Sequence, residues 1–307
     1  MKNQYVVRLE EIIREKMGDH PLYDFSCELE GDMVTVSYSL QPGSSFSLRG
    51  SVPYQALESN VEQVAEKFLE EVDAFNGFVR KGGLYLQDGS LNMNFDEVSS
   101  LLFVRALPLS QMTDQFVYRV VGDIALVAYL RLRRDENGLS SIKLPAKLAE
   151  RWEKTQDEVM DVALENTLKE TPPVVMNLQR MLQEMGSYEG ENLLSMSREE
   201  FMSNFPMDFM GICVTIKGKL NGAVAPFLPG VAKFISDCVQ GSYYLVFTSI
   251  HEVMIHKLSA SKVDHLVEVL GDTLRKATDP DELLSRQVYV YNRKEDKISL
   301  ASLDKEA

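Results

Sequence analysis

The chain has 307 residues, of which 45% are hydrophobic and 25% charged, a composition typical of a globular protein and not of a fibrous or disordered one. Its 46 acidic and 32 basic residues give a formal net charge of −14, which disfavours direct binding to nucleic acid because phosphate contacts need clustered Lys and Arg. Residues 1–5 lack the apolar core of a signal peptide and no apolar stretch could span a bilayer, so we expect a cytoplasmic protein with no membrane partner.

The first third of the sequence predicts helices and short strands. Apolar residues at helical spacing predict an N-terminal helix, and a turn at residues 30–32 predicts a β-hairpin. The clearest helix of the chain follows, with its opposite face largely acidic. Its apolar members are Leu57, Val61, Val64, Ala65, Phe68, Leu69 and Val72. Residues 77–94, rich in Gly and Asn, predict an irregular or hairpin-like segment.

The middle of the sequence predicts strands and then helices. Residues 116–132 predict two strands joined near Gly122 and Asp123. A helix on the face of Leu144, Leu148 and Trp152 follows. Thr155 and Glu158 then form the pattern of a capping box for a helix that Pro172 and Pro173 stop. A short helix around Leu178 precedes residues 186–200, whose polar composition predicts a mobile loop.

The last third predicts a compact α+β unit. Apolar segments indicate strands at residues 212–216, 223–225, 243–247 and 252–257 and a closing hairpin at 288–291 and 298–300. Two helices are expected among them, one following Leu228 and one capped by Ser261 with Asp264.

Together these elements predict an α+β fold of mixed helices and antiparallel sheets. We expect an N-terminal α+β region at residues 1–110, packed on a C-terminal α+β region at residues 111–307. Because no clear linker separates the two, a single continuous domain is the alternative.

Three segments carry a resemblance to a known family. Gly222-Ala223 follows a strand, and residues 244–253 read YLVFTSIHEV; residues 163–167 look like the central segment of the same family. With these residues the last third resembles an uncharacterised bacterial domain-of-unknown-function family common in gut anaerobes. More distantly, the middle of the chain is similar to a second uncharacterised bacterial family. The resemblance implies a fold and a bacterial or mobile-element setting, and no reaction.

The excess of acidic residues is spread over helices, as at Glu58, Glu62 and Glu66. One interpretation is a well-solvated surface. The other is a binding surface that complements a basic protein partner, which makes these three glutamates candidate binding residues.

A second candidate binding surface combines methionine with phenylalanine after the polar stretch. Phe205, Met207 and Phe209 belong to this cluster. Clusters of flexible apolar side chains can form adaptable binding surfaces, and the alternative is ordinary core packing.

The sequence predicts no metal site and no cofactor. His251 and His256 are five residues apart, whereas a zinc-protease helix places two histidines four apart so that both face one ion. The three cysteines, Cys27, Cys213 and Cys238, form no CxxC motif; Cys213 and Cys238 lie in apolar surroundings that predict buried thiols. No phosphate-binding glycine loop is present.

Ser249, His251 and Glu252 are the candidate catalytic residues: Ser249 and His251 could share one strand face as a nucleophile and a base, but the many Asp and Glu residues do not single out an orienting acid. The alternative is that polar side chains at this corner satisfy the main chain. The leading hypothesis for function is a non-enzymatic protein that binds another macromolecule or regulates it. The runner-up is a hydrolase-like enzyme with these three residues in its site.

Overall fold

The computed structural model describes residues 4–17, 23–39, 47–81, 94–135, 138–177, 180, 188–205 and 211–302. It is an α+β fold in which every described strand pairing is antiparallel, as predicted. The chain forms two compact units, the first of residues 1–94 and 131–142 and the second of residues 95–130 and 143–307. The predicted division at residue 110 falls inside the second unit. None of the described helices is long and apolar enough to cross a membrane.

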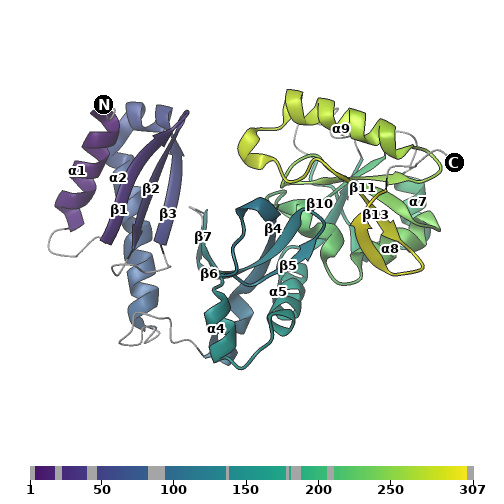
Figure 1. Ribbon diagram of the computed structural model, residues 1–307, viewed down its shortest axis with the longest axis horizontal. Helices are drawn as coiled ribbons and strands as arrows, with labels where there is room; N and C mark the ends of the chain where they lie inside the picture. The colour runs from purple at the N-terminus through teal and green to yellow at the C-terminus, as the bar shows by residue number, and fades with distance from the viewer. Residues whose placement is uncertain are drawn as a thin grey trace. The chain divides into compact units, whose positions relative to one another are not determined.

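The first unit packs two helices on a three-stranded sheet (Figure 1). Its helices are α1 (Gln4–Met17) and α2 (Tyr54–Lys81), and its strands are β1 (Tyr23–Glu30), β2 (Met33–Ser39) and β3 (Ser47–Pro53). Alternate residues of β2, Val34, Val36 and Tyr38, are buried, and the ring of Tyr38 meets that of Phe68 on α2 edge to face. The alternation of apolar residues along the strand thus fixes which face carries the helices.

Helix α2 confirms the clearest prediction and corrects its end. The helix continues to Lys81, so the predicted irregular segment starts too early; residues 82–93 lie outside the described residues. Near its start, Asn60 leaves the helical conformation, and its side chain accepts a hydrogen bond from the main-chain N–H of Gln63 at 3.0 Å. Asn60 therefore caps the longer, second part of the helix.

A small sheet in the order β4-β6-β5 lies mainly in the second unit; β7 (Gly138–Lys143), which pairs with β6, belongs to the first unit except for Lys143. Its strands are β4 (Leu102–Pro108), β5 (Tyr118–Val121) and β6 (Ile124–Asp135), and the Gly122-Asp123 turn joins β5 to β6 as predicted. Helix α5 (Gln156–Glu170) covers one face, and Thr155 and Glu158 form its predicted capping box. Around the sheet lie α3 (Phe95–Val98), η1 (Ser99–Leu101), η2 (Leu109–Gln111) and α4 (Ala146–Arg151).

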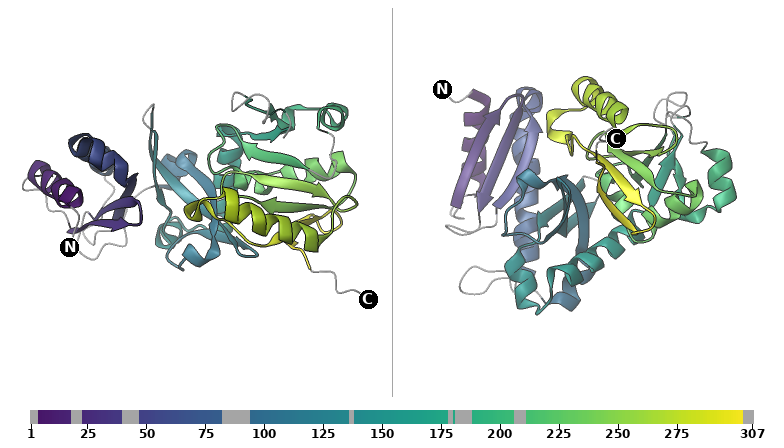
Figure 2. Two further views of the ribbon diagram at one scale, coloured as in Figure 1. Left: turned by 90° about the horizontal axis from the view of Figure 1, so that it is seen from above. Right: turned by 45° about the vertical axis from the view of Figure 1, so that its right-hand side comes forward.

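A seven-stranded sheet forms the rest of this unit, in the order β14-β13-β11-β12-β10-β8-β9. Its strands are β8 (Pro173–Met176), β9 (Glu191–Asn192), β10 (Ile212–Ile216), β11 (Tyr243–Phe247), β12 (Val253–Lys257), β13 (Val288–Asn292) and β14 (Lys297–Leu300). Helix α9 (Val263–Ala277) runs along one face, as both views of Figure 2 show. The unit also contains η3 (Leu193–Ser195), α7 (Arg198–Asn204), η4 (Gly222–Phe227), α8 (Val231–Val239) and η5 (Pro280–Glu282). Of these, η3 and η4 contact strands of the sheet, and α7 packs on α8.

The structure corrects three predictions in the second unit. The strand predicted at residues 223–225 is part of the 3₁₀ helix η4, because these residues are buried on all sides and have no strand alternation. The predicted loop at 186–200 contains β9, which pairs with β8, and the start of α7, which Ser197 and Glu200 cap; Gly186 and Ser187 are outside the described residues. Helix α9 begins one residue later than expected, with Lys262 as its N-cap and no side-chain cap, so Ser261 does not cap it.

Candidate functional site

The predicted Ser249, His251 and Glu252 lie in the turn between β11 and β12. The hydroxyls of Thr248 and Ser249 both donate hydrogen bonds to Oε1 of Glu252, at 2.6 and 2.8 Å. Ser249 Oγ also accepts a hydrogen bond from the main-chain N–H of His251, at 2.9 Å. The three residues are therefore close together, and the turn is held by its own side chains.

Both ring nitrogens of His251 have partners from outside the turn. Nδ1 accepts a hydrogen bond from the main-chain N–H of Asn221 at 3.0 Å, and Nε2 lies 3.2 Å from Oε1 of Glu282. Because Nδ1 is an acceptor here, the ring proton of the neutral imidazole is on Nε2 and is donated to Glu282. His251 thus joins the β11–β12 turn to two segments that lie 30 and 31 residues away in the chain.

This geometry does not favour Ser249 as a nucleophile with His251 as its base. An activated serine needs a hydrogen bond from its hydroxyl to the imidazole, whereas Ser249 Oγ bonds the carboxylate of Glu252 and the imidazole bonds Glu282. Ser249 is also only 6% exposed. A catalytic role for these residues therefore stays a prediction without support from their hydrogen bonds.

We expect His251→Ala to lower the free energy of unfolding by about 1–2 kcal/mol, because the main-chain N–H of Asn221 loses its acceptor. His251→Asn should recover part of this loss, since its amide oxygen can accept the same hydrogen bond. The exposed His265 on α9 gives a matched control, and His265→Ala should change little. Urea denaturation checks all three variants; an unchanged stability of His251→Ala would contradict the structural role.

The residues that the structure describes include no group of three or more His, Cys, Asp or Glu side chains that could hold a metal ion. His256 lies buried on β12, separated from the turn that holds His251. The absence of a zinc site stays a prediction, which elemental analysis of the purified protein can test.

The acidic face on α2 is open to solvent. Glu58, Glu62 and Glu66 are all exposed, and Oε1 of Glu66 forms an ion pair with Nζ of Lys16 on α1 at 3.1 Å. In the described part of the chain, Glu66 alone among the three has an ion-pair partner. Their binding role remains a prediction.

Phe205, the first member of the predicted Met–Phe cluster, is a core residue. It is 1% exposed and its ring lies 5.8 Å from that of Phe201, which in turn meets Phe234 on α8 edge to face. Met207 and Phe209 are outside the described residues. For Phe205, core packing explains the position.

The cysteines are buried thiols, as predicted for Cys213 and Cys238. Burial, with a smaller effect from the charge of Glu252, raises the pKa of Cys213 to about 12; burial likewise raises the pKa of Cys238 to about 11. The reactive form of a thiol is the thiolate, and these pKa values keep both groups protonated at neutral pH.

We expect Cys213 and Cys238 to resist a disulfide reagent at pH 8 in the native protein. The thiolate fraction of Cys213 at this pH should be roughly 10³-fold below that of an ordinary thiol with a pKa of ~8.5. Counting the thiols modified with time, in buffer and in denaturant, checks this. Rapid native reaction at either residue would show that its surroundings open easily.

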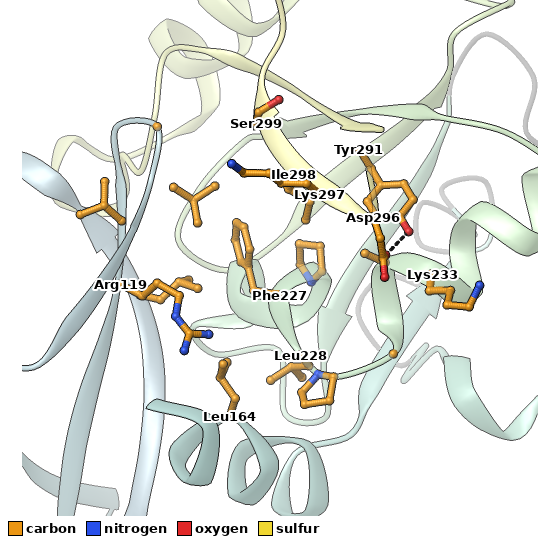
Figure 3. A pocket seen from close by; sticks show the side chains of 18 of the residues that line it. Arg119, Leu164, Phe227, Leu228, Lys233, Tyr291, Asp296, Lys297, Ile298 and Ser299 are labelled. Carbon is orange, nitrogen blue, oxygen red and sulfur yellow. Dashed lines mark hydrogen bonds between the residues drawn. The ribbon is translucent and has the colours of Figure 1, made fainter. Parts of the chain in front are cut away.

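A hollow of about 890 Å³ lies in the second unit, away from the His251 turn (Figure 3). Its floor is apolar. Phe227 and Leu228 project into it from the end of η4, and Leu164 does so from α5. The ring of Phe227 stacks on that of Phe247 in the sheet, with centroids 5.8 Å apart and planes at 5°, so the floor is anchored in the core.

Charged side chains stand at the edge of the hollow and most of them are paired. Arg119 donates hydrogen bonds to Asp157 and Asp161 on α5, at 2.8 and 2.9 Å. The hydroxyl of Tyr291 donates to Asp296, as the dashed line in Figure 3 marks. Burial, strengthened by this carboxylate, raises the pKa of Tyr291 above its ordinary value. Because these groups are paired, the rim of the hollow is nearly neutral, and it surrounds an apolar floor.

Two edge strands border the hollow. β14 is the last strand of the large sheet and β5 the last of the small one, and all four residues of β14 line the hollow. The N–H of Ala301 bonds the carbonyl of Val288 at 2.9 Å, so in this antiparallel register Ser299 also faces β13. Ile298 and Leu300 therefore direct their main-chain groups away from β13, toward an edge that pairs with no further strand and that contacts β5.

Sequence reasoning did not find this hollow. Its lining comes from four separate stretches, residues 119–126, Leu164, residues 226–233 and residues 291–300. The closing hairpin was predicted, but nothing in its composition marks which edge stays open.

The fold and the hollow define an antiparallel α+β domain with a preformed surface cavity. The model of the family of unknown function DUF5688 matches residues 93–293, and the chain belongs to this family. The match lies within the second unit apart from its first two residues and residues 131–142. No curated protein and no solved structure matches the chain.

Proposed function

We propose that this protein is a non-enzymatic binding protein whose family domain receives an extended, apolar segment of another protein in the hollow beside β14. The observation that carries the proposal is the combination of an anchored apolar floor at Phe227 with the open main-chain edge of β14.

The size and lining of the hollow support a binding role. Cavities of about 300–1,000 Å³ with mostly apolar walls and a few polar groups are typical of ligand sites. An exposed sheet edge adds a second recognition element, because an extended peptide can form main-chain hydrogen bonds to it while its alternate side chains enter pockets. Ile298 and Leu300 offer both the main-chain groups and the apolar side chains for this mode.

The net charge of the chain suggests which kind of residue flanks the bound segment. With a net charge of −14, the protein would attract a segment flanked by basic residues and repel an acidic one. We place the interaction in a bacterial cytoplasm, where buried thiols such as those of Cys213 and Cys238 stay reduced.

Selection of random peptides for binding to the full-length protein tests the proposal. We expect the selected peptides to carry apolar residues at alternate positions, and Leu300→Arg to weaken their binding at least ~10-fold, because the bound peptide would have to cover a charge in place of the apolar wall. Leu220→Arg is the matched control, since Leu220 is 68% exposed in the same unit and does not line the hollow.

Two results would contradict the proposal. One is that selection yields no peptide that binds. The other is that the selected peptides bind the Leu300→Arg and Leu220→Arg variants as tightly as the original protein. A salt titration of the complex then examines the charge argument separately, because attraction between exposed charges weakens as salt rises.

A further inference from the structure

Arg105 on β4 lies on the opposite face of the small sheet from α5. Along β4, Leu102, Val104 and Ala106 are buried, and the N–H of Val104 bonds Thr167 of α5. Because side chains alternate along a strand, Arg105 and its neighbour Phe103 belong to the other face.

Aromatic rings hold the guanidinium of Arg105. Its Cζ lies 4.7 Å from the ring centroid of Tyr129 and 5.2 Å from that of Phe103. Phe103 and Tyr129 are directly opposite in the register of β4 and β6, and their rings are stacked 5.5 Å apart. The rings attract the cation and fix its position, while the apolar residues Val127, Leu107 and Tyr118 complete the cluster.

Arg105 has no carboxylate partner in the described part of the chain, and this distinguishes it from comparable arginines. Arg14 lies over Phe25 and also bonds Glu10, and Arg180 lies over a tyrosine ring and also pairs with Glu191. On the α5 side of the same small sheet, Arg119 bonds two aspartates. Although the chain has 46 acidic residues, none of those that the structure describes pairs with Arg105.

One hydrogen-bond donor of Arg105 is also unsatisfied. Its Nε is buried and has no hydrogen-bond partner. The pKa of Arg105 is lowered because burial disfavours its charged form, and the neighbouring Tyr129 offsets part of this effect. A buried donor without a partner and a desolvated charge without a counterion both lower stability unless something binds them.

We propose that Arg105 is the cation of an oxyanion-binding site, which receives the carboxylate or phosphate group of a small ligand on the face formed by Phe103, Arg105 and Tyr129. The edge of a guanidinium presents parallel N–H donors that match two oxygens of such a group. Bound there, the oxyanion supplies the missing counterion and an acceptor for Nε. The surrounding rings exclude water and so strengthen the pair.

NMR titration of the full-length protein, labelled with ¹⁵N at arginine Nε, tests the site directly. The probes are sodium acetate and sodium phosphate, with sodium chloride at equal ionic strength as the reference. We expect a saturable shift of the Arg105 Nε–H resonance, assigned by its absence in Arg105→Lys. Saturation with acetate identifies a carboxylate ligand, and saturation with phosphate alone identifies a phosphate ligand. No saturation with either, or the same shift with chloride, overturns the proposal.

Thermal unfolding separates this role from a structural one. Arg105→Met removes the charge and keeps an apolar side chain over the rings. The melting temperature in chloride should therefore stay the same. The rise in melting temperature that the saturating anion causes in the original protein should be lost. Arg119→Met, which loses two ion pairs on the opposite face, should keep the anion response. If Arg105→Met melts lower than the original protein and the Nε resonance is silent to both anions, Arg105 is structural and the proposal is wrong.

Discussion

Gly222→Ala should lower the free energy of unfolding by about 3 kcal/mol or more, because an added methyl group has no space where η4 meets the large sheet. A Cβ on Gly222 would lie 1.9 Å from Oγ1 of Thr215, 2.4 Å from the carbonyl oxygen of His251 and 2.8 Å from the main-chain nitrogen of Ile216. Two of these atoms are main chain. The third cannot turn away freely, since Thr215 Oγ1 donates a 2.7 Å hydrogen bond to the same His251 carbonyl.

Gly271→Ala is the matched control for this substitution. Gly271 lies in α9 with nothing within 4 Å of its would-be Cβ, so alanine there should raise stability by about 0.5–1 kcal/mol through its better helix propensity. Urea denaturation measures both variants. Adding Thr215→Ala to Gly222→Ala should recover part of the loss; a Gly222→Ala protein as stable as the original would show that η4 does not pack this closely.

Local patterns predicted most of the fold and failed where burial is uniform. Polar turns flanked by alternating residues identified the β5–β6 and β13–β14 hairpins, and Pro173 marked the end of a helix. The segment Ala223-Val224-Ala225 is apolar throughout, and such a run is compatible with a strand or a buried helix. The contact that decides between them is made by Gly222 with strand β10 and the turn at His251, which no local pattern reveals.

The candidate sites were harder to predict because their partners are distant in the sequence. The sequence singled out the segment around His251, but the groups that bond its imidazole, Asn221 and Glu282, are 30 and 31 residues away. Arg105 looks like an ordinary strand residue until β6 brings Tyr129 opposite Phe103. In both cases the residue type indicated a polar group, and only the tertiary structure showed which residues that group contacts.

The second large effect is expected where the β5–β6 turn meets β13. The hydroxyl of Tyr289 donates to Oδ1 of Asp123 and accepts a hydrogen bond from the main-chain N–H of Asp123 at 3.0 Å. Ser285 Oγ donates to the same carboxylate oxygen at 2.7 Å. Tyr289 and Ser285 are 0% and 3% exposed, so neither hydroxyl can turn to water instead. Asp123 thus satisfies two buried donors and fixes the small sheet against the large one.

Asp123→Ala should therefore cost about 1–3 kcal/mol, since the buried hydroxyl of Ser285 loses its acceptor and that of Tyr289 keeps only the carbonyl oxygen of Val121, at 3.1 Å. Tyr289→Phe should cost about 1–3 kcal/mol, and the double variant less than the sum of the two, because the residues share one network. Tyr291→Phe is the control: it removes the same kind of hydroxyl from a bond to Asp296, a residue exposed to solvent, and should cost less. Strict additivity of Asp123→Ala and Tyr289→Phe would contradict the coupling.

The same network predicts how stability depends on pH. Burial first, and then the carboxylate of Asp123, raise the pKa of Tyr289 above its ordinary value, so the native state keeps this proton where the unfolded chain releases it. Below pH ~10 both states are protonated and the contribution of the group is constant; above it, stability should fall by about 1.4 kcal/mol per pH unit until the native pKa is reached. Tyr289→Phe should remove the part of this decline in stability that comes from Tyr289. Denaturation curves measured between pH 9 and 11 check the difference, and parallel declines in the two proteins would show that Tyr289 ionises as readily when folded as when unfolded.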